Sequence, residues 1–327
     1  MTMPTTPKAT RRLFTGRTIG LFIFTAMLFA LLGVVSRTFL TRYTMFVISR
    51  TMAFFVLIAM SQAVCLVVGG MNLSVGAIGS MVTVVLGLCL DPAHWGLGGC
   101  GAVPIALAAG AAMGLFNGVL ITRLRINSFI VTLSTMFIFM GLRSGISGGQ
   151  PYAVPTSFWH IGQRGIGGVP YVVIITVGVL MASSYMFRNT VFGRRLLATG
   201  GNAEAARLSG IDTDAMVVWA NVLSGLFAAL AAVLWASKLG SAAPETGDNW
   251  LIVSFAVAII GGTGLAGGTI SPLGILMGAT IYTLIKHALV ELKANPYYEN
   301  AYLGALILLA IGIDRIREIY GQRRKKR

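Results

Sequence analysis

Acidic residues are scarce in this sequence, with only 10 aspartates and glutamates among 327 residues. All charged residues together make up 11% of the chain, whereas about 25% is usual in a soluble domain. A water-soluble fold would have to hide the 56% of apolar residues in one core, and single cores stop growing at about 250–300 residues. Together with a mean hydropathy of +0.81, the scarcity of charge excludes an ordinary soluble protein and indicates an integral membrane protein.

The sequence also has few of the residues that build catalytic or metal sites. Its three cysteines, Cys65, Cys89 and Cys100, show no metal-ligand spacing, and we interpret them as small apolar side chains. The three histidines are scattered, and neither an HExxH nor a P-loop pattern occurs. A membrane enzyme is therefore the least favoured class, and we expect no catalytic residue, no metal and no cofactor in this chain.

About ten apolar stretches are long enough to cross a bilayer as helices, which takes about 20 residues each. Helices are expected because a spanning segment must satisfy its own backbone hydrogen bonds in lipid. A β-barrel is not favoured, because these runs are apolar on all sides instead of alternating. The predicted spans are residues 18–36, 46–68, 73–90, 101–121, 128–146, 170–187, 215–236, 250–266, 272–290 and 300–314. The predicted fold is an all-α, polytopic transmembrane helical bundle over residues 18–315, between basic tails at 1–17 and 316–327.

Lysine and arginine are distributed unevenly between the predicted loops. With the N-terminus in the cytoplasm and ten spans, 17 of the 25 basic residues fall on the inner side, and the other eight scatter over outer loops and span ends. This asymmetry predicts a multi-pass protein of the bacterial plasma (inner) membrane with both termini in the cytoplasm. The net charge of +15 does not indicate nucleic acid as a partner, because the basic residues flank apolar runs.

Two glycine-rich segments, residues 67–76 and 259–268, resemble each other. Each follows one apolar run and precedes another, and the two preceding spans run in the same direction across the membrane. We interpret the similarity as a parallel internal repeat in which spans 2–4 correspond to spans 8–10. The alternative is that two Gly-Gly pairs recur by chance in a chain with 41 glycines.

Glycine-rich breaks of this kind predict the position of a solute pathway. Irregular backbone at membrane depth is stable only where protein buries it or where it lines a water-filled path. Interrupted segments in both halves of a transporter are the best pointer to its binding site. For any single polar residue in a span, hydrogen bonding between helices is the commoner role. With that alternative open, the predicted pathway residues are Gly69, Gly70, Asn72, Ser74, Asn117, Gly261, Gly262 and Thr263.

The longest predicted inner loop, residues 188–214, contains the pattern of a short helix. Asn202 suits an N-cap, and Gly210 suits the stop at the C-terminal end. The residues from Ala203 onward are good helix formers with an early Glu204. An ordinary interfacial helix is one interpretation. However, Glu204-Ala205-Ala206 followed by Gly210 resembles the EAA…G pattern of ABC-importer permeases, in which such a helix docks into a groove of the ATPase subunit.

Four ordered motifs make the chain similar to permeases of the ribose/monosaccharide ABC-importer family between about residues 46 and 315. Residues 69–76 correspond to the family sequence GGIDLSVG, and residues 128–136 correspond to PFIVTLGTM. Residues 192–211 follow FG…YAxGGNxxAAxLxGI, and residues 260–268 follow IGGTSLxGG. The chain departs from the family at Asn72, where relatives carry an acidic residue, and near Leu251, where the family glutamate is missing. These departures leave the identity of the sugar open.

The resemblance implies a permease subunit of an ATP-driven importer that performs no bond chemistry itself. Its implied partners are an ABC ATPase subunit that binds the ATP, a second permease copy or a homologous permease, and a periplasmic or extracellular sugar-binding protein. The implied ATPase-coupling residues are Gly201, Asn202, Glu204, Ala205, Ala206, Arg207 and Gly210.

Two other kinds of transporter remain open. One is an ABC permease for branched-chain amino acids or nucleosides. The other is an ion-coupled secondary transporter, which would be expected to carry carboxylates inside its spans. The interiors of the predicted spans offer none, and this absence disfavours the ion-coupled class.

Replacing Glu204 and Arg207 together should weaken docking of the ATPase subunit and leave membrane insertion intact, because both residues lie in a loop outside the predicted spans. Co-purification with the tagged permease measures docking, and the amount of permease in the membrane fraction measures insertion. Recovery of the ATPase at an undiminished yield with the double variant would contradict the coupling role.

Overall fold

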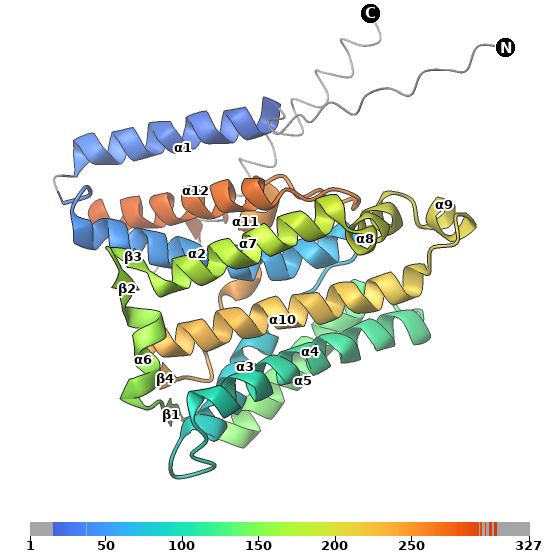
Figure 1. The fold of residues 1–327 in the computed structure, drawn as a ribbon, viewed down its shortest axis with the longest axis horizontal. Coiled ribbons are helices and arrows are strands. Elements are labelled where there is room, and N and C mark those ends of the chain that lie inside the picture. Colours follow the sequence, from blue (N-terminus) through green and yellow to red (C-terminus); the bar gives the residue numbers. More distant parts are fainter. Residues whose placement is uncertain are drawn as a thin grey trace, which may run out of the picture.

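The computed structural model describes residues 16–36, 38–293, 295, 298, 301, 302, 304 and 305. Most of the tenth predicted span and both basic tails therefore lie outside the described residues. Helices dominate the described part, accompanied by two small β-ribbons (Figure 1). The long helices are α1 Gly16–Val35, α2 Arg42–Val67, α3 Val75–Leu90, α4 Gly99–Arg123, α5 Ser128–Ser147, α7 Tyr171–Asn189, α10 Thr213–Leu239 and α12 Pro272–Glu291. The shorter helices are α6 Thr156–Gln163, α8 Val191–Gly201, α9 Ala203–Leu208 and α11 Trp250–Ile260.

Nine of the predicted spans coincide with helices of the described part. Six helices are long and apolar enough to cross a membrane, namely α2, α4, α5, α7, α10 and α12. Three further apolar helices, over Gly20–Val35, Val75–Leu90 and Trp250–Ile260, are shorter. The polytopic helical bundle is thus confirmed, whereas the number of ten spans and the parallel internal repeat are not. The span predicted over 250–266 was too long, because α11 ends at Ile260 and Gly262 adopts a positive φ of 88°.

Helix α2 lies in the middle of the bundle. It contacts α7, α10, α11 and α12, and 83% of its apolar window is buried inside the protein. Its largest buried side chains include Phe54, Leu57, Ile58, Met60 and Leu66. A helix that is apolar on all sides is expected to be surrounded by other helices or by lipid, and for α2 the neighbours are helices.

Helices α4 and α10 pack closely because α4 presents glycines at every fourth position. Gly110, Gly114 and Gly118 lie on one side of α4, since residues four apart in a helix lie above one another. A Cβ added at Gly114 would overlap the carbonyl oxygen of Asn221 on α10, and one added at Gly118 would lie 2.7 Å from the Cα of Val218. Small residues at this spacing let two membrane helices approach and gain van der Waals contact.

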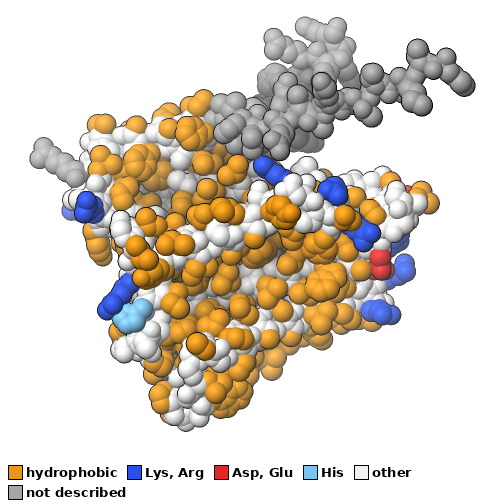
Figure 2. Space-filling view, in the orientation of Figure 1, with side chains coloured by type: hydrophobic (Ala, Val, Ile, Leu, Met, Phe, Trp, Pro, Cys, Tyr) orange, Lys and Arg blue, Asp and Glu red, His pale blue; other side chains and the backbone are white. Residues whose placement is uncertain are grey.

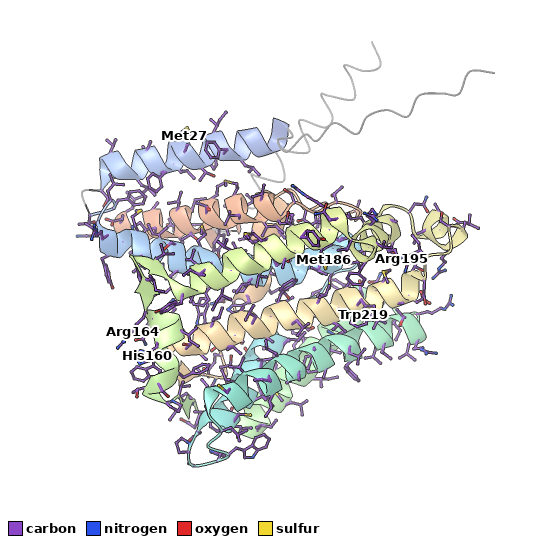
Figure 3. The ribbon with its side chains drawn as sticks, viewed as in Figure 1. Met27, His160, Arg164, Met186, Arg195 and Trp219 are labelled. Atoms are coloured by element: carbon purple, nitrogen blue, oxygen red, sulfur yellow. The ribbon has the colours of Figure 1, made fainter. Side chains whose placement is uncertain are left out.

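Charged side chains lie at the two ends of the bundle. Figure 1 places α8 and α9 at one end and α6 with both β-ribbons at the other. Strand β1 (Tyr152–Ala153) pairs antiparallel with β4 (Ser241–Ala242), and β2 (Gly165–Ile166) pairs with β3 (Val169–Pro170). Apolar side chains cover the side of the molecule between these ends, and basic side chains gather at the ends (Figure 2). Figure 3 shows Arg195 at the α8 end, with His160 and Arg164 at the α6 end. We refer to these as the α9 end and the α6 end.

Candidate functional site

The first glycine-rich break, between α2 and α3, is organised by the side chain of Asn72. Asn72 is 0% exposed. Its Oδ1 accepts hydrogen bonds from the backbone N–H of Ser74 at 2.9 Å and from the Ser74 hydroxyl at 2.6 Å. Its Nδ2 donates to the hydroxyl of Ser224 on α10 at 2.9 Å. Asn72 thus fixes the irregular backbone of the break and ties it to a second helix.

The hydrogen bonds of Asn72 continue into α2 and α4. Ser61 on α2 donates to the carbonyl oxygen of Ser224 at 2.8 Å, and the two hydroxyls lie 3.0 Å apart. On the other side, Nδ2 of Asn117 on α4 donates to the Ser74 hydroxyl at 2.8 Å, and Oδ1 of Asn117 has no hydrogen-bond partner. One polar network therefore joins α2, α4, α10 and the break in the interior of the bundle.

The first turn of α5 satisfies the remaining backbone groups of the break. The hydroxyl of Ser128 accepts from the N–H of Met71 at 3.1 Å, and the hydroxyl of Thr132 accepts from the N–H of Leu73 at 3.1 Å. Buried backbone N–H groups outside a helix need such partners. Both hydroxyls belong to residues 128–136, so the second family motif holds the first motif in place.

The three polar side chains predicted to line a pathway at this break are enclosed in the present conformation. Asn72, Ser74 and Asn117 are all fully buried and bond to one another or to neighbouring helices. Gly69, with a φ of 79°, follows the end of α2, and Gly70 lies against Ser128. Their role in lining a pathway stays a prediction, because a solute would reach the three polar side chains only after these helices separate.

The second break, between α11 and α12, packs by backbone contact. A Cβ added at Gly261 would lie 2.7 Å from the Cα of Ile275, so α12 approaches the break closely. The N–H of Gly262 donates to Ile259, and the N–H of Thr263 donates to Ala258. The Thr263 hydroxyl is buried and has no hydrogen-bond partner. A pathway role for Gly261, Gly262 and Thr263 is likewise untested.

The short helix predicted in the 188–214 loop is present as α9. Oδ1 of Asn202 accepts from the N–H of Ala205 at 3.0 Å, which is the predicted N-cap, and Gly210 follows the helix with a φ of 79°. Helix α8, which precedes it, was not predicted, although Thr190 caps it by accepting from the N–H of Gly193. Thr190 would have been the sequence signal for this start.

The side chains of α9 face in different directions. Ala206 is buried against the protein, whereas Glu204, Ala205 and Leu208 are exposed. Leu208 is 86% exposed, and sequence analysis did not single it out. Leu208 is therefore apolar surface that the described part of the chain leaves uncovered.

Arg207 binds within the chain. Its Nε donates to the Thr213 hydroxyl at 2.7 Å, and its Nη2 donates to Oδ1 of Asp214 at 2.9 Å. Both partners lie in the first turn of α10, so Arg207 joins α9 to that helix. The side chains of Arg207 and Asp214 are each about half exposed, and such surface ion pairs contribute about 0–1 kcal/mol.

The end of α8 meets both glycine-rich breaks at one point. The N–H of Gly268, in the second break, donates to the carbonyl oxygen of Val67 at the end of α2, with an N–O distance of 2.8 Å. Gly200 lies against the same oxygen and against the nitrogen of Gly268, and no Cβ would fit there. We call Val67, Gly200 and Gly268 the glycine junction. It links the α8–α9 segment to the end of α2, where the first break begins, and to the second break through backbone atoms alone.

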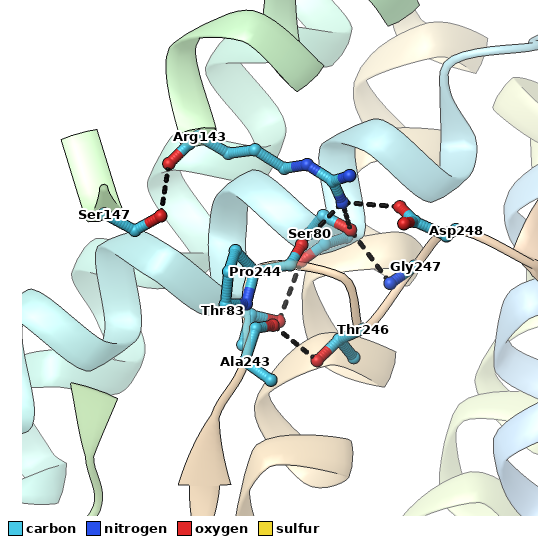
Figure 4. A network of polar contacts seen from close by, with 10 residues as sticks. Ser80, Thr83, Arg143, Ser147, Ala243, Pro244, Thr246, Gly247 and Asp248 are labelled. Carbon is cyan, nitrogen blue, oxygen red and sulfur yellow. Dashed lines mark hydrogen bonds and ion pairs between the residues drawn. The ribbon is translucent and has the colours of Figure 1, made fainter. Parts of the chain in front are cut away.

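Near the α6 end, a buried arginine ties the loop before α11 to the bundle (Figure 4). Arg143 on α5 is 6% exposed. Its Nη1 donates to the Ser80 hydroxyl on α3 at 2.7 Å and to Oδ1 of Asp248 at 2.6 Å. Ser80 also accepts from the N–H of Gly247 at 2.8 Å. An arginine inside a predicted span signals a partner of this kind, but only the fold identifies it as Asp248.

Cationic and aromatic side chains lie together at the same end of α2, α10 and α12. Nζ of Lys238 is 4.7 Å from the ring centre of Trp235 and 5.4 Å from that of Phe54. Nζ of Lys286 is 5.9 Å from the ring centre of Phe55. Phe54 and Phe55 are buried, and they pack edge-on against Trp235 and Tyr282. Among the described residues, no group of three or more His, Cys, Asp or Glu could hold a metal ion.

Comparison with known proteins identifies relatives over most of the chain. Residues 44–311 match the family described as "Branched-chain amino acid transport system / permease component". The chain is 30% identical over 285 residues to the autoinducer 2 import system permease protein LsrC of Yersinia pseudotuberculosis serotype O:3 (strain YPIII). The aligned region covers 87% of this chain and 80% of the relative. The protein of the same name from Yersinia pestis has the same identity and coverage. No solved structure matches the chain.

The network around Asn72 predicts that Asn72→Leu destabilises the protein and that Asn72→Asp does not. Leucine removes the hydrogen bonds that Asn72 makes with the N–H of Ser74 and with the Ser224 hydroxyl. Each buried polar group left unsatisfied lowers the stability of the fold by about 1–3 kcal/mol. Aspartate, the family residue, keeps an acceptor for Ser74 and can accept from the Ser224 hydroxyl, which rotates to donate. The unfolding temperature of the detergent-purified protein measures both effects. Equal unfolding temperatures for Asn72→Leu and the unmodified protein would contradict the structural role of Asn72.

Proposed function

Because the chain belongs to the family of branched-chain amino acid transport system permease components, we propose that it is the translocating subunit of an importer for a monosaccharide. It is a multi-pass permease of the inner membrane. Its curated relatives are named as permease proteins of an import system. In the proposed assembly an ABC ATPase subunit binds and hydrolyses ATP. A second permease copy or a homologous permease completes the path, and a sugar-binding protein outside the membrane delivers the solute.

The glycine junction is the observation that carries this proposal. A permease that is driven by a separate ATPase needs a contact that turns movement of its docking helix into movement of its pathway. Gly200 joins the α8–α9 segment to Val67 and Gly268 by close backbone packing. Both glycine-rich breaks, which are the proposed pathway segments, start or end at this contact.

Helix α9 is the proposed docking element for the ATPase subunit. It stands at the end of the bundle (Figure 1), with Glu204 and Leu208 exposed. Leu208 would fill an apolar groove of the ATPase, and Glu204 would set the register with a basic partner group. Arg207, engaged with Asp214, holds α9 on α10, so movement of α9 is passed on to the bundle. In this proposal the α9 end faces the cytoplasm, and the distribution of basic residues favours the same side for both chain termini.

Transport then follows from differential stability between two arrangements of the bundle. Closure of the ATPase pair on ATP favours one position of α9, and hydrolysis removes that preference. The nucleotide can shift the balance only by its differential affinity for the two arrangements. In the conformation described above, the Asn72 network closes the interior, and opening requires the bonds between the break, α4 and α10 to separate.

The monosaccharide is proposed from the four sequence motifs and from the side chains at the α6 end. Lys238, which lies over the rings of Phe54 and Trp235, offers ammonium donors to the hydroxyl groups of a sugar. The family description names branched-chain amino acids, and the curated relatives are named for autoinducer 2. A permease for one of these solutes is therefore the second candidate.

Uptake assays distinguish these solutes. The permease is reconstituted in proteoliposomes with its ATPase and binding protein, and ATP-dependent uptake is measured for a panel of monosaccharides, autoinducer 2 and leucine. We expect saturable uptake of one monosaccharide that stops without ATP. Uptake of leucine alone would replace the sugar assignment. Uptake driven by an ion gradient without the ATPase would overturn the proposal.

The glycine junction predicts that Gly200→Ala uncouples ATP hydrolysis from transport. The added methyl group collides with the carbonyl oxygen of Val67 and separates α8 from the second break. Overpacking of this kind destabilises the native packing by about 1–3 kcal/mol. In the same proteoliposomes, the number of solute molecules moved per ATP should fall, while ATPase binding persists. Gly178→Ala on α7 is the control, because no atom lies within 4 Å of the added Cβ. An unchanged transport-to-ATP ratio in Gly200→Ala would refute the role of the junction.

A further inference from the structure

A pocket of about 430 Å³ lies beside α9, between the end of α4, the turn that leads into α5 and the start of α10. Its lining combines apolar and polar side chains. The lining residues are Ile121, Thr122, Arg125, Ile126, Asn127, Arg207, Asp214 and Val217. None of the functional assignments above uses this space, apart from the contact between Arg207 and Asp214 on its wall.

The charges that line the pocket favour an anion. Arg125 forms no ion pair with any described carboxylate, and its guanidinium offers five N–H donors. Arg207 and Asp214 neutralise each other, which leaves one net positive charge. Nη1 of Arg207 and Nδ2 of Asn127 add donors, since the Asn127 bond to the Phe129 N–H uses only its oxygen. A fork of guanidinium donors with further N–H groups matches a phosphate group.

The backbone holds Arg125 at this position in an uncommon conformation. Its φ is 53°, in the left-handed region that residues other than glycine rarely adopt. Such a conformation costs about 1–3 kcal/mol and tends to occur at functional sites. The turn thus places the guanidinium of Arg125, which pairs with no described carboxylate, on the wall of the pocket between the end of α4 and the start of α10.

The surroundings of the pocket identify the source of the phosphate as a lipid. Leu124, Ile126, Phe129 and Ile130, on the turn and the first residues of α5, are all exposed and apolar. In a membrane protein this surface faces acyl chains. The apolar side of the bundle reaches the charged α9 end of the molecule (Figure 2), and the pocket lies beside α9 at that end. In a membrane, the border between apolar and charged surface is expected at the level of the lipid headgroups. Basic pockets between helices at this level are suited to anionic headgroups.

We propose that this pocket binds the phosphate-bearing headgroup of an anionic phospholipid, with Arg125 as its main ligand and the acyl chains along the start of α5. Binding would bring the α4–α5 turn and the start of α10 together. Because Arg207 contributes both to the pocket wall and to the attachment of α9, the bound lipid would also steady α9. That last consequence rests on the proposed docking role of α9, whereas the lipid site itself does not.

The test compares two arginines that lie two residues apart. Arg125→Ala removes the pocket cation, and Arg123→Ala removes an exposed cation from the last turn of α4 that does not line the pocket. Phosphatidylglycerol and phosphatidylcholine are titrated into the detergent-purified full-length permease, and bound lipid is counted by native mass spectrometry. One cation near a headgroup contributes enough for Arg125→Ala to bind phosphatidylglycerol about fivefold more weakly. Arg123→Ala should bind it as the unmodified protein does.

A second variant separates loss of the ligand from damage to the turn. Glycine adopts a positive φ without strain, so Arg125→Gly removes the guanidinium and should fold at least as well as the unmodified chain. We expect the same weakening for Arg125→Gly, with an unfolding temperature that rises less than that of the unmodified protein when phosphatidylglycerol is added.

Several outcomes would overturn the proposal. These are equal binding of phosphatidylglycerol and phosphatidylcholine, equal loss in the two alanine variants, or full displacement of the lipid by inorganic phosphate at the same concentration. Loss of ATPase recovery in Arg125→Gly with unchanged lipid binding would instead assign the pocket to an acidic segment of the ATPase. Because lipid binding is measured on the permease alone, the result does not depend on the identity of the transported solute.

Discussion

The need to satisfy backbone hydrogen bonds away from water controls this structure. A helix satisfies its own N–H and C=O groups, and lipid offers none of the partners that a break would need. The break between α2 and α3 is stable because Ser128, Thr132 and Asn72 supply those partners from the side. Asn72, Ser74 and Asn117, which are fully buried, meet at this interruption. The same residues decide how α4, α5 and α10 are arranged around the break.

Close backbone contact is the second consequence of the breaks. Glycine has no Cβ, and three chain segments can therefore meet at Val67, Gly200 and Gly268 with no side chain between them. Such a contact transmits displacement directly, since closely packed backbones cannot absorb movement by changing side-chain rotamers. This contact is a physical connection for the proposed link between a docking helix and a pathway. The sequence motifs imply that link only because they occur in one chain.

The departures from the family motifs have structural counterparts. Asn72 occupies the position of the acidic family residue, and its amide fulfils an accepting and a donating role at once. The family glutamate near Leu251 is missing, and the nearby Asp248 forms the ion pair with Arg143. The solute preference of the chain need not follow that of relatives with the acidic residues.

Sequence by itself determined the membrane environment, most of the long helices, the position of both glycine-rich breaks and the capped helix in the 188–214 loop. These features follow from hydropathy, capping and glycine content, which act within a few neighbouring residues. Only the tertiary structure decided that Arg143 binds Asp248, 105 residues away, and that Asn72 binds Ser224, 152 residues away. It also decided that Arg207 holds α9 to α10 and that Gly200 meets both breaks. Those partners are chosen by the packing of whole helices, and many pairings of small and polar residues are compatible with the same local patterns.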